Sequence, residues 1–296
     1  MIRFTDGVCL KERFIPTDNG NIWSCVYGED KEGTPLLVVH GGPGFLSMPQ
    51  TVSDLSDERP VYFYDQLGCG RSDRASRDEL YSLETYTKEL DVIRDELGLS
   101  DVILVGFSWG CGLICSYLLD EGPKGVKGLI LSGPLLSSPM WEKDQRMNTT
   151  ALTDSAIAAI EKGERDREYG DEYGEAVTEY YRKFVCNLDP WPDYLVNSME
   201  RMNMDVYKKM WGPSEFTVTG CLKYFDLYPR LREIDVPALL TCGDRDEAHV
   251  KTVKDFQEAF GNACMAVIPD ATHMHHIERP ELYRATVEWF LGTLRD

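Results

Sequence analysis

The pentapeptide at 106–110, Gly-Phe-Ser-Trp-Gly, constrains the fold of this chain more than any other segment, because it sets a serine between two glycines. An apolar run at 102–105 precedes it, and mostly small or apolar residues follow at 111–119. These flanks suit a strand before the serine and a buried helix after it. A serine on such a sharp turn presents its hydroxyl above the sheet, where it can attack a carbonyl carbon. The pattern therefore predicts a nucleophilic Ser108, against the alternative of an ordinary strand-to-helix turn.

Six apolar runs have the length and composition of strands in a parallel sheet. They predict strands over 35–40, 61–64, 102–105, 126–132, 237–242 and 264–268. Continuous apolar runs are typical of strands that are buried on both faces. Apolar residues spaced by three and four predict helices over 82–97 and 280–294. Alternating strands and helices indicate an α/β fold with a doubly wound, mostly parallel sheet.

The composition changes between residues 134 and 225, where strand-like runs vanish and charged helical stretches and aromatic residues take their place. We interpret this segment as a helical cap domain. It is inserted into a core made of residues 1–133 and 226–296. Most of its aromatic side chains are expected to pack the interior of the cap, and some to line a substrate pocket.

The net charge of −19, from 50 acidic and 31 basic residues, argues against nucleic acid or an anionic membrane as a partner. The first residues lack the apolar region of a signal peptide, and no run of about 18 apolar residues occurs. The nine cysteines form no C-x-x-C pair, which favours unpaired thiols in a reducing compartment. A cytoplasmic location is therefore expected.

A nucleophilic serine needs a base and an acidic residue that orients the base. With a serine on this kind of turn, the acid and then the histidine follow it along the chain. The loop after the strand at 237–242 offers Asp244 and Asp246 as acids. The loop after the last strand offers His273 as the base, whereas His249 lies too close to the acidic loop and is predicted to open a helix.

Two further patterns raise the question of a metal or a cofactor. His273, His275 and His276 are close in sequence, but no motif elsewhere supplies a further ligand, so no metal site is expected. Gly68 and Gly70 lack the G-x-G-x-x-G helix start of a dinucleotide site. No cofactor is therefore expected.

The segment 40–44, His-Gly-Gly-Pro-Gly, follows a predicted strand and is similar to the glycine-rich oxyanion loops of serine hydrolases. The N–H groups of Gly42 and Trp109 are predicted to bind the oxyanion of the tetrahedral intermediate. Each such donor typically stabilises the transition state by ~3 kcal/mol. The segment 65–72 is expected to act as a scaffold beneath the site, with substrate binding as the alternative.

Four motifs and a late histidine together resemble the proline iminopeptidase (prolyl aminopeptidase) family of α/β-hydrolases, of the tricorn-interacting aminopeptidase type. The motifs are HGGPG at 40–44, DQLGCGRS at 65–72, GFSWG at 106–110 and GDRDE at 243–247. The resemblance covers nearly the whole chain and implies an α/β-hydrolase fold. It selects Ser108, Asp246 and His273 as the triad, and Gly42 and Trp109 as oxyanion donors. The implied activity is that of a serine exopeptidase, which releases an N-terminal residue, often proline, from short peptides or amides through an acyl-enzyme.

The resemblance also points to Glu215 and Glu247 as the residues that bind the free amine of the substrate. A free N-terminus is largely cationic near neutral pH, and carboxylates favour that form. The chain departs from the family pattern at Phe107, where glycine is frequent, and in the run at 274–276, Met-His-His. The preferred first residue therefore stays open between proline and other small or apolar residues.

Other activities are compatible with the same residues. An amino-acid amidase or esterase would use the same triad. A weakly catalytic, ligand-binding protein with a hydrolase fold is a further alternative, although a pure binder needs no triad. Enzymes that use an aspartate nucleophile, such as epoxide hydrolases and haloalkane dehalogenases, do not fit the serine at position 108.

Overall fold

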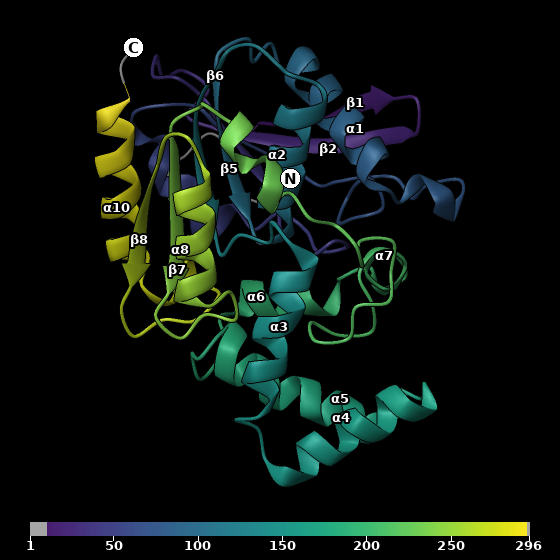
Figure 1. Ribbon diagram of the computed structural model, residues 1–296. Helices are drawn as coiled ribbons and strands as arrows, with labels where there is room; N and C mark the ends of the chain where they lie inside the picture. Colours follow the sequence, from purple (N-terminus) through teal and green to yellow (C-terminus); the bar gives the residue numbers. More distant parts are fainter. Residues whose placement is uncertain (1–10, 295–296) are drawn as a thin grey trace.

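The computed structural model describes residues 11–294, which form an eight-stranded sheet with helices on both faces (Figure 1). The order of the strands in the sheet is β1-β2-β4-β3-β5-β6-β7-β8. The strands from β4 to β8 pair in parallel, and β1 and β2 join them antiparallel. The strands are β1 (Lys11–Thr17), β2 (Gly20–Tyr27), β3 (Leu36–Val39), β4 (Val61–Tyr64), β5 (Val102–Phe107), β6 (Val126–Ser132), β7 (Ala238–Gly243) and β8 (Ala263–Ile268).

The six predicted strands are present as β3 to β8, and the predicted fold class is confirmed. The hairpin of β1 and β2 was not predicted from the sequence. The predicted burial of β8 was also wrong, because this strand forms the edge of the sheet and most of its residues are only half-buried. Val267 in β8 is 41% exposed.

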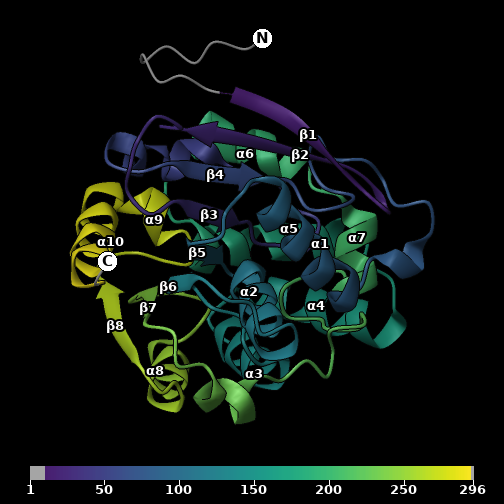
Figure 2. The same ribbon diagram turned by 90° about the horizontal axis from the view of Figure 1, so that it is seen from above.

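Different helices cover the two faces of the sheet (Figure 2). One face packs against α1 (Leu83–Glu96), α2 (Trp109–Asp120) and α8 (Val250–Ala259), and the other against α10 (Pro280–Thr293). Both predicted helices, 82–97 and 280–294, are present as α1 and α10. Ser82 caps α1 by accepting the N–H of Thr85 at 3.3 Å, a contact worth about 1 kcal/mol in typical helices.

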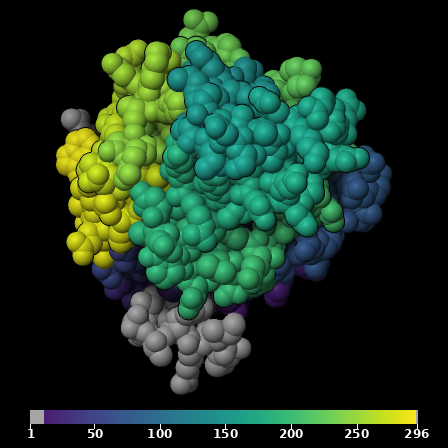
Figure 3. Space-filling model, turned by 90° about the horizontal axis from the view of Figure 1, so that it is seen from below, coloured from purple at the N-terminus to yellow at the C-terminus, as the bar shows by residue number. Residues whose placement is uncertain are grey.

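The segment between β6 and β7 is helical and lies at one end of the sheet (Figure 1). Its atoms, in teal and green, occupy much of the face seen from below (Figure 3). Several of its aromatic residues pack into a small core of its own, including Tyr173, Tyr180 and Phe216. This content agrees with the interpretation as a cap, whose boundaries at 133/134 and 225/226 stay a prediction. The helices are α3 (Ser138–Thr149), α4 (Asp154–Asp166), α5 (Asp171–Tyr180), a π-helical turn η4 (Tyr181–Val185), α6 (Asp193–Glu200) and α7 (Met204–Met210).

Short helices complete the described chain. They are η1 (Pro49–Thr51), η2 (Ser53–Asp57), η3 (Asp78–Leu80), η5 (Tyr228–Glu233) and α9 (His275–Glu278). None of the helices within residues 11–294 is long and apolar enough to cross a membrane. All eight cysteines in this range are unpaired, and most of them are buried; Cys9 lies outside the described residues.

Candidate active site

The turn between β5 and α2 holds Ser108 in an unusual backbone conformation, with φ 51° and ψ −118°. A positive φ is uncommon for a residue other than glycine and marks strain that the surroundings maintain. The Ser108 N–H donates to the Ser132 carbonyl at 2.9 Å. A Cβ on Gly110 would lie 2.2 Å from the Val39 carbonyl oxygen, so only glycine lets α2 approach β3 this closely. The local structure is that of a nucleophile elbow.

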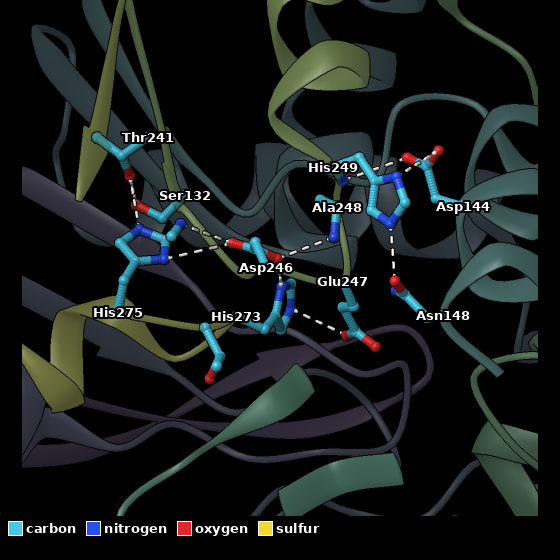
Figure 4. A network of polar contacts seen from close by, with 12 residues as sticks. Ser132, Asp144, Asn148, Thr241, Asp246, Glu247, Ala248, His249, His273 and His275 are labelled. Carbon is cyan, nitrogen blue, oxygen red and sulfur yellow. Dashed lines mark hydrogen bonds and ion pairs between the residues drawn. The ribbon is translucent and has the colours of Figure 1, made fainter. Parts of the chain in front are cut away.

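The acid and the base predicted from the sequence meet directly (Figure 4). Nδ1 of His273 lies 2.8 Å from Oδ1 of Asp246. Two backbone N–H groups also hold Asp246, that of Ala248 at 2.9 Å and that of Gly243 at 3.0 Å. Asp244, the other candidate, is exposed and accepts a backbone N–H on the opposite side of the loop, from Ala271 at 3.1 Å. The structure therefore brings Asp246, and not Asp244, to His273.

The electrostatics of this pair follow from burial and mutual attraction. Burial opposes the charge on Asp246, but the neighbouring His273 outweighs it and holds the pKa of Asp246 below its ordinary value. Burial likewise opposes the charge on His273. The attraction of Asp246, then Glu247, nevertheless raises the pKa of His273 to about 9. At neutral pH the histidine of the free site is therefore largely protonated.

Ser108 and His273 line the same pocket. Among residues 11–294, no hydrogen bond joins the Ser108 hydroxyl to His273; Nε2 of the histidine lies 3.5 Å from Oε1 of Glu247 instead. Hydrogen bonds between nucleophile and base are often long before substrate binds and tighten in the complex. The arrangement is thus compatible with a serine–histidine pair.

The loop after β3 lies against the nucleophile elbow. A Cβ on Gly41 would be 3.2 Å from the Cβ of Ser108. Gly42 has a φ of +93°, and a Cβ there would lie 2.7 Å from the backbone nitrogen of Phe45, which restricts the position to glycine. Trp109 is the first residue of α2, so its N–H has no partner within the helix. Both predicted oxyanion donors, Gly42 and Trp109, line the pocket with Ser108.

The segment 65–72 supports the loop after β3 through hydrogen bonds. Nε2 of His40 accepts the backbone N–H of Gln66 at 3.0 Å. The side-chain amide of Gln66 donates to the His40 carbonyl, and its oxygen accepts the indole N–H of Trp109. Asp65 accepts the backbone N–H of Ser47 at 2.8 Å. Burial lowers the pKa of His40, which keeps Nε2 available as an acceptor. These contacts agree with the scaffold interpretation, since no residue of this segment lines the pocket.

Two carboxylates, Glu215 and Glu247, line the same pocket. Glu247 is 2% exposed, and its Oε2 has no hydrogen-bond partner. Oε1 of Glu215 accepts the hydroxyl groups of Tyr207 at 2.6 Å and Tyr181 at 3.5 Å. Burial raises the pKa of both carboxyl groups, and the charge of Glu215 raises that of Glu247 further. No lysine or arginine forms an ion pair with either carboxylate within residues 11–294.

Helix α3 anchors the loop that carries Glu247, a feature that the sequence reasoning missed. The amide of Gln145 donates to the Glu247 carbonyl at 3.1 Å. One turn further on, Asn148 Oδ1 lies 2.7 Å from Nε2 of His249, and Asp144 accepts the His249 N–H at 3.2 Å (Figure 4). His249 itself precedes α8, as predicted. No local sequence signal identifies these residues, because the contacts span about a hundred positions.

Of the residues that depart from the family pattern, Phe107, Met274 and His276 line the pocket, and His275 does not. The ring of Phe107 lies 4.3 Å from that of His276. His275 is fully buried, with Nδ1 at 3.6 Å from Oδ2 of Asp246 and Nε2 at 2.8 Å from the Thr241 hydroxyl. His273 and His275 thus contact the two oxygens of Asp246, whereas His276 packs against Phe107. None of the described residues forms a His, Cys, Asp or Glu cluster suited to a metal ion.

Comparison with known proteins identifies the family. The model of the alpha/beta hydrolase fold family matches residues 34–280. A proline iminopeptidase from Heyndrickxia coagulans is 39% identical over 96% of this chain and 99% of its own length. A proline iminopeptidase from Lactobacillus delbrueckii subsp. lactis is 32% identical over 96% of this chain and 99% of its own length.

Solved structures agree with these matches. The crystal structure of a proline iminopeptidase from Mycobacterium smegmatis has a TM-score of 0.86 and 29% identity, and covers 95% of this chain and 98% of its own. The crystal structure of VinJ has a TM-score of 0.91 and 28% identity, over 96% of this chain and 99% of its own. The resemblance seen in the motifs is confirmed, and the chain belongs to the proline iminopeptidase family of α/β-hydrolases, a family of serine exopeptidases.

Proposed function

We propose that this enzyme releases the N-terminal residue, proline or another small or apolar residue, from short peptides or amides that carry a free N-terminus. One observation carries the proposal: Glu215 and Glu247 line the pocket of Ser108 and His273 without a lysine or arginine partner among the described residues. Buried carboxylates are costly unless enough positive charge lies beside them. The one imidazolium, that of His273, lies 2.8 Å from Asp246 and 3.5 Å from Glu247, so it does not balance Glu215 and Glu247 as well as Asp246. The ammonium group of a substrate supplies that missing charge.

The reaction follows from the residues around the pocket. The Ser108 hydroxyl attacks the carbonyl carbon of the first residue, and His273 accepts the hydroxyl proton. Asp246 stabilises the imidazolium, while the N–H groups of Gly42 and Trp109 donate to the oxyanion. The carbon–nitrogen bond then breaks as His273 passes the proton to the leaving nitrogen. Water attacks the resulting ester and regenerates the serine.

The pH dependence tests the electrostatics separately from amine binding. For a neutral acyl ester, kcat/KM is expected to rise with pH toward a midpoint of about 9, because the base must be neutral and the attraction of Asp246, Glu247 and Glu215 raises its pKa. In Glu247→Gln the midpoint moves to lower pH, since a carboxylate 3.5 Å from Nε2 is lost. Glu161→Gln, at an exposed site of α4, leaves the profile unchanged. A midpoint that stays in place in Glu247→Gln contradicts this description.

A substrate panel separates the proposed activity from the alternatives. We expect the 2-naphthylamides of proline and alanine to be hydrolysed with higher kcat/KM than simple acyl naphthylamides without an amine. Preference for simple acyl esters over every aminoacyl compound would indicate an esterase, and preference for primary amino-acid amides an amidase. Binding without turnover of any compound would indicate a ligand-binding protein.

The cellular setting belongs to the same proposal. The unpaired cysteines among residues 11–294 support a reducing, cytoplasmic compartment. The excess of acidic residues supports small cationic substrates rather than nucleic acid or anionic membranes.

A further inference from the structure

One wall of the pocket is rich in methionine. Of the ten methionines in the chain, four line this pocket: Met48, Met199, Met202 and Met274. They come from three separate parts of the chain, and all four are half-buried. Their side chains pack around a small apolar cluster that contains Phe45. The pocket therefore has an apolar side that the proposed chemistry does not use.

Hydrogen bonds fix this wall to the oxyanion loop. Met202 precedes Asn203, whose backbone N–H donates to the Gly44 carbonyl at 2.7 Å. The Asn203 side-chain amide donates to the Gly68 carbonyl at 2.8 Å. Met48 lies shortly after the oxyanion loop on the same segment of chain. These bonds hold the segment that carries Met202 against the loop that carries Gly44.

The side chains around Glu215 and Glu247 differ from those around the methionines. The indole N–H of Trp211 donates to the backbone carbonyl of Glu215 at 3.3 Å. The ring of Trp141 lies 6.5 Å from that of Trp211 and 5.6 Å from that of His273. Aromatic rings therefore make up most of the surroundings of the end that is proposed to bind the ammonium group, and of the four methionines only Met274 packs against the neighbouring aromatic cluster of Tyr180 and Phe216.

The covalent structure of the substrate limits which of its groups can contact the four methionines. Only one carbon separates the ammonium group from the scissile carbonyl, so the first residue is confined between Glu215, Glu247 and Ser108. Its side chain starts from that same carbon, and we place it toward Trp141 and Trp211 at the aromatic end. The substrate has nothing before its free amine. The leaving group is therefore the only part of the substrate that extends beyond the first residue.

We propose that the wall formed by Met48, Met199, Met202 and Met274 is the leaving-group subsite and that it takes an apolar side chain on the second residue of the substrate. This inference rests on the proposed function. Methionine is unbranched and polarisable, so a wall of methionines adapts to apolar groups of different shape. Large aliphatic and aromatic second residues should therefore be accepted, and glycine or charged residues disfavoured.

The parameter kcat/KM reports this subsite directly. The leaving group departs in the acylation step, which kcat/KM includes. Substrates with the same first residue share one acyl-enzyme, so hydrolysis of that intermediate cannot distinguish them. A series with constant first residue and varied second residue isolates the proposed contacts.

The experiment compares Pro-Gly-amide, Pro-Leu-amide and Pro-Phe-amide. For the wild-type enzyme we expect kcat/KM for the leucine and phenylalanine compounds to exceed that for the glycine compound about tenfold or more, from burial of the added side chain. In the double variant Met199→Ser/Met202→Ser the ratio of kcat/KM for the leucine compound to that for the glycine compound should fall toward one. Met147→Ser, at an exposed site that does not line the pocket, and Met202→Leu should keep the preference.

Several results would overturn the inference. Equal kcat/KM for the three compounds in the wild type would show that the wall does not contact the leaving group. A double variant that changes the preference among first residues, with the second residue constant, would assign the wall to the first residue instead. Loss of all three rates in proportion would mean a general defect and no subsite. If the wild type cleaves neither these three compounds nor their alanyl counterparts, the proposed function fails, and this inference with it.

Discussion

Replacing Ser108 by alanine is expected to lower kcat on prolyl 2-naphthylamide by about 10⁴-fold or more, because the covalent route to the product is lost. Alanine keeps the Cβ and the backbone, and the Ser108 N–H still bonds to the Ser132 carbonyl. The melting temperature should therefore stay close to that of the wild type. Steady-state kinetics and a thermal unfolding curve on the same preparation check both statements.

A matched control is Ser155→Ala, which removes an exposed hydroxyl in α4 and should leave kcat unchanged. Substantial activity in Ser108→Ala, together with normal unfolding, would mean that the elbow serine is not the nucleophile. The triad and the oxyanion loop would then need another explanation.

Replacing either pocket carboxylate by its amide should abolish the preference for a free amine. Removing one partner of a buried charge pair typically costs 3–5 kcal/mol, which corresponds to roughly 10²–10⁴-fold in kcat/KM. We expect losses of this size for Glu215→Gln and Glu247→Gln on prolyl 2-naphthylamide. A neutral acyl ester, which has no ammonium group, should be affected far less.

Glu175→Gln supplies the control, because Glu175 is an exposed glutamate of the helical segment that does not line the pocket. It should behave like the wild type on both substrates. If the two pocket variants lose activity equally on the amine and on the neutral ester, the carboxylates do not bind the amine and serve the fold or the triad instead.

Local patterns predicted the part of the fold that positions the nucleophile. Strands β3 to β7 contain short runs of apolar residues, and the glycines around Ser108 mark a tight turn, so neither needs distant contacts to be recognised. The hairpin of β1 and β2 lacks this signal on its outer strand. β1 lies at the edge of the sheet, and most of its residues are exposed, so it carries no apolar run.

The candidate site depended more on tertiary structure. Asp244 and Asp246 are equivalent as residues of one loop, and the family resemblance alone selected Asp246 from the sequence; in the structure, the positions of His273 and of the Ala271 N–H distinguish them. Tyr207, which donates to Glu215, is one of many aromatic residues in the helical segment, and nothing in its neighbourhood in sequence marks it. Contacts between residues far apart in sequence leave no local pattern.

We propose that the pocket carboxylates, Glu215 and Glu247, direct Ser108 to a carbonyl beside a free amine. The most direct measurement is the ratio of kcat/KM for prolyl 2-naphthylamide to that for its N-acetyl derivative, with the wild-type enzyme near neutral pH. The two compounds share the scissile bond and the leaving group and differ in the cationic nitrogen. We predict a ratio of about 10² or more. A ratio near one would contradict the account, because the amine would then contribute nothing to recognition.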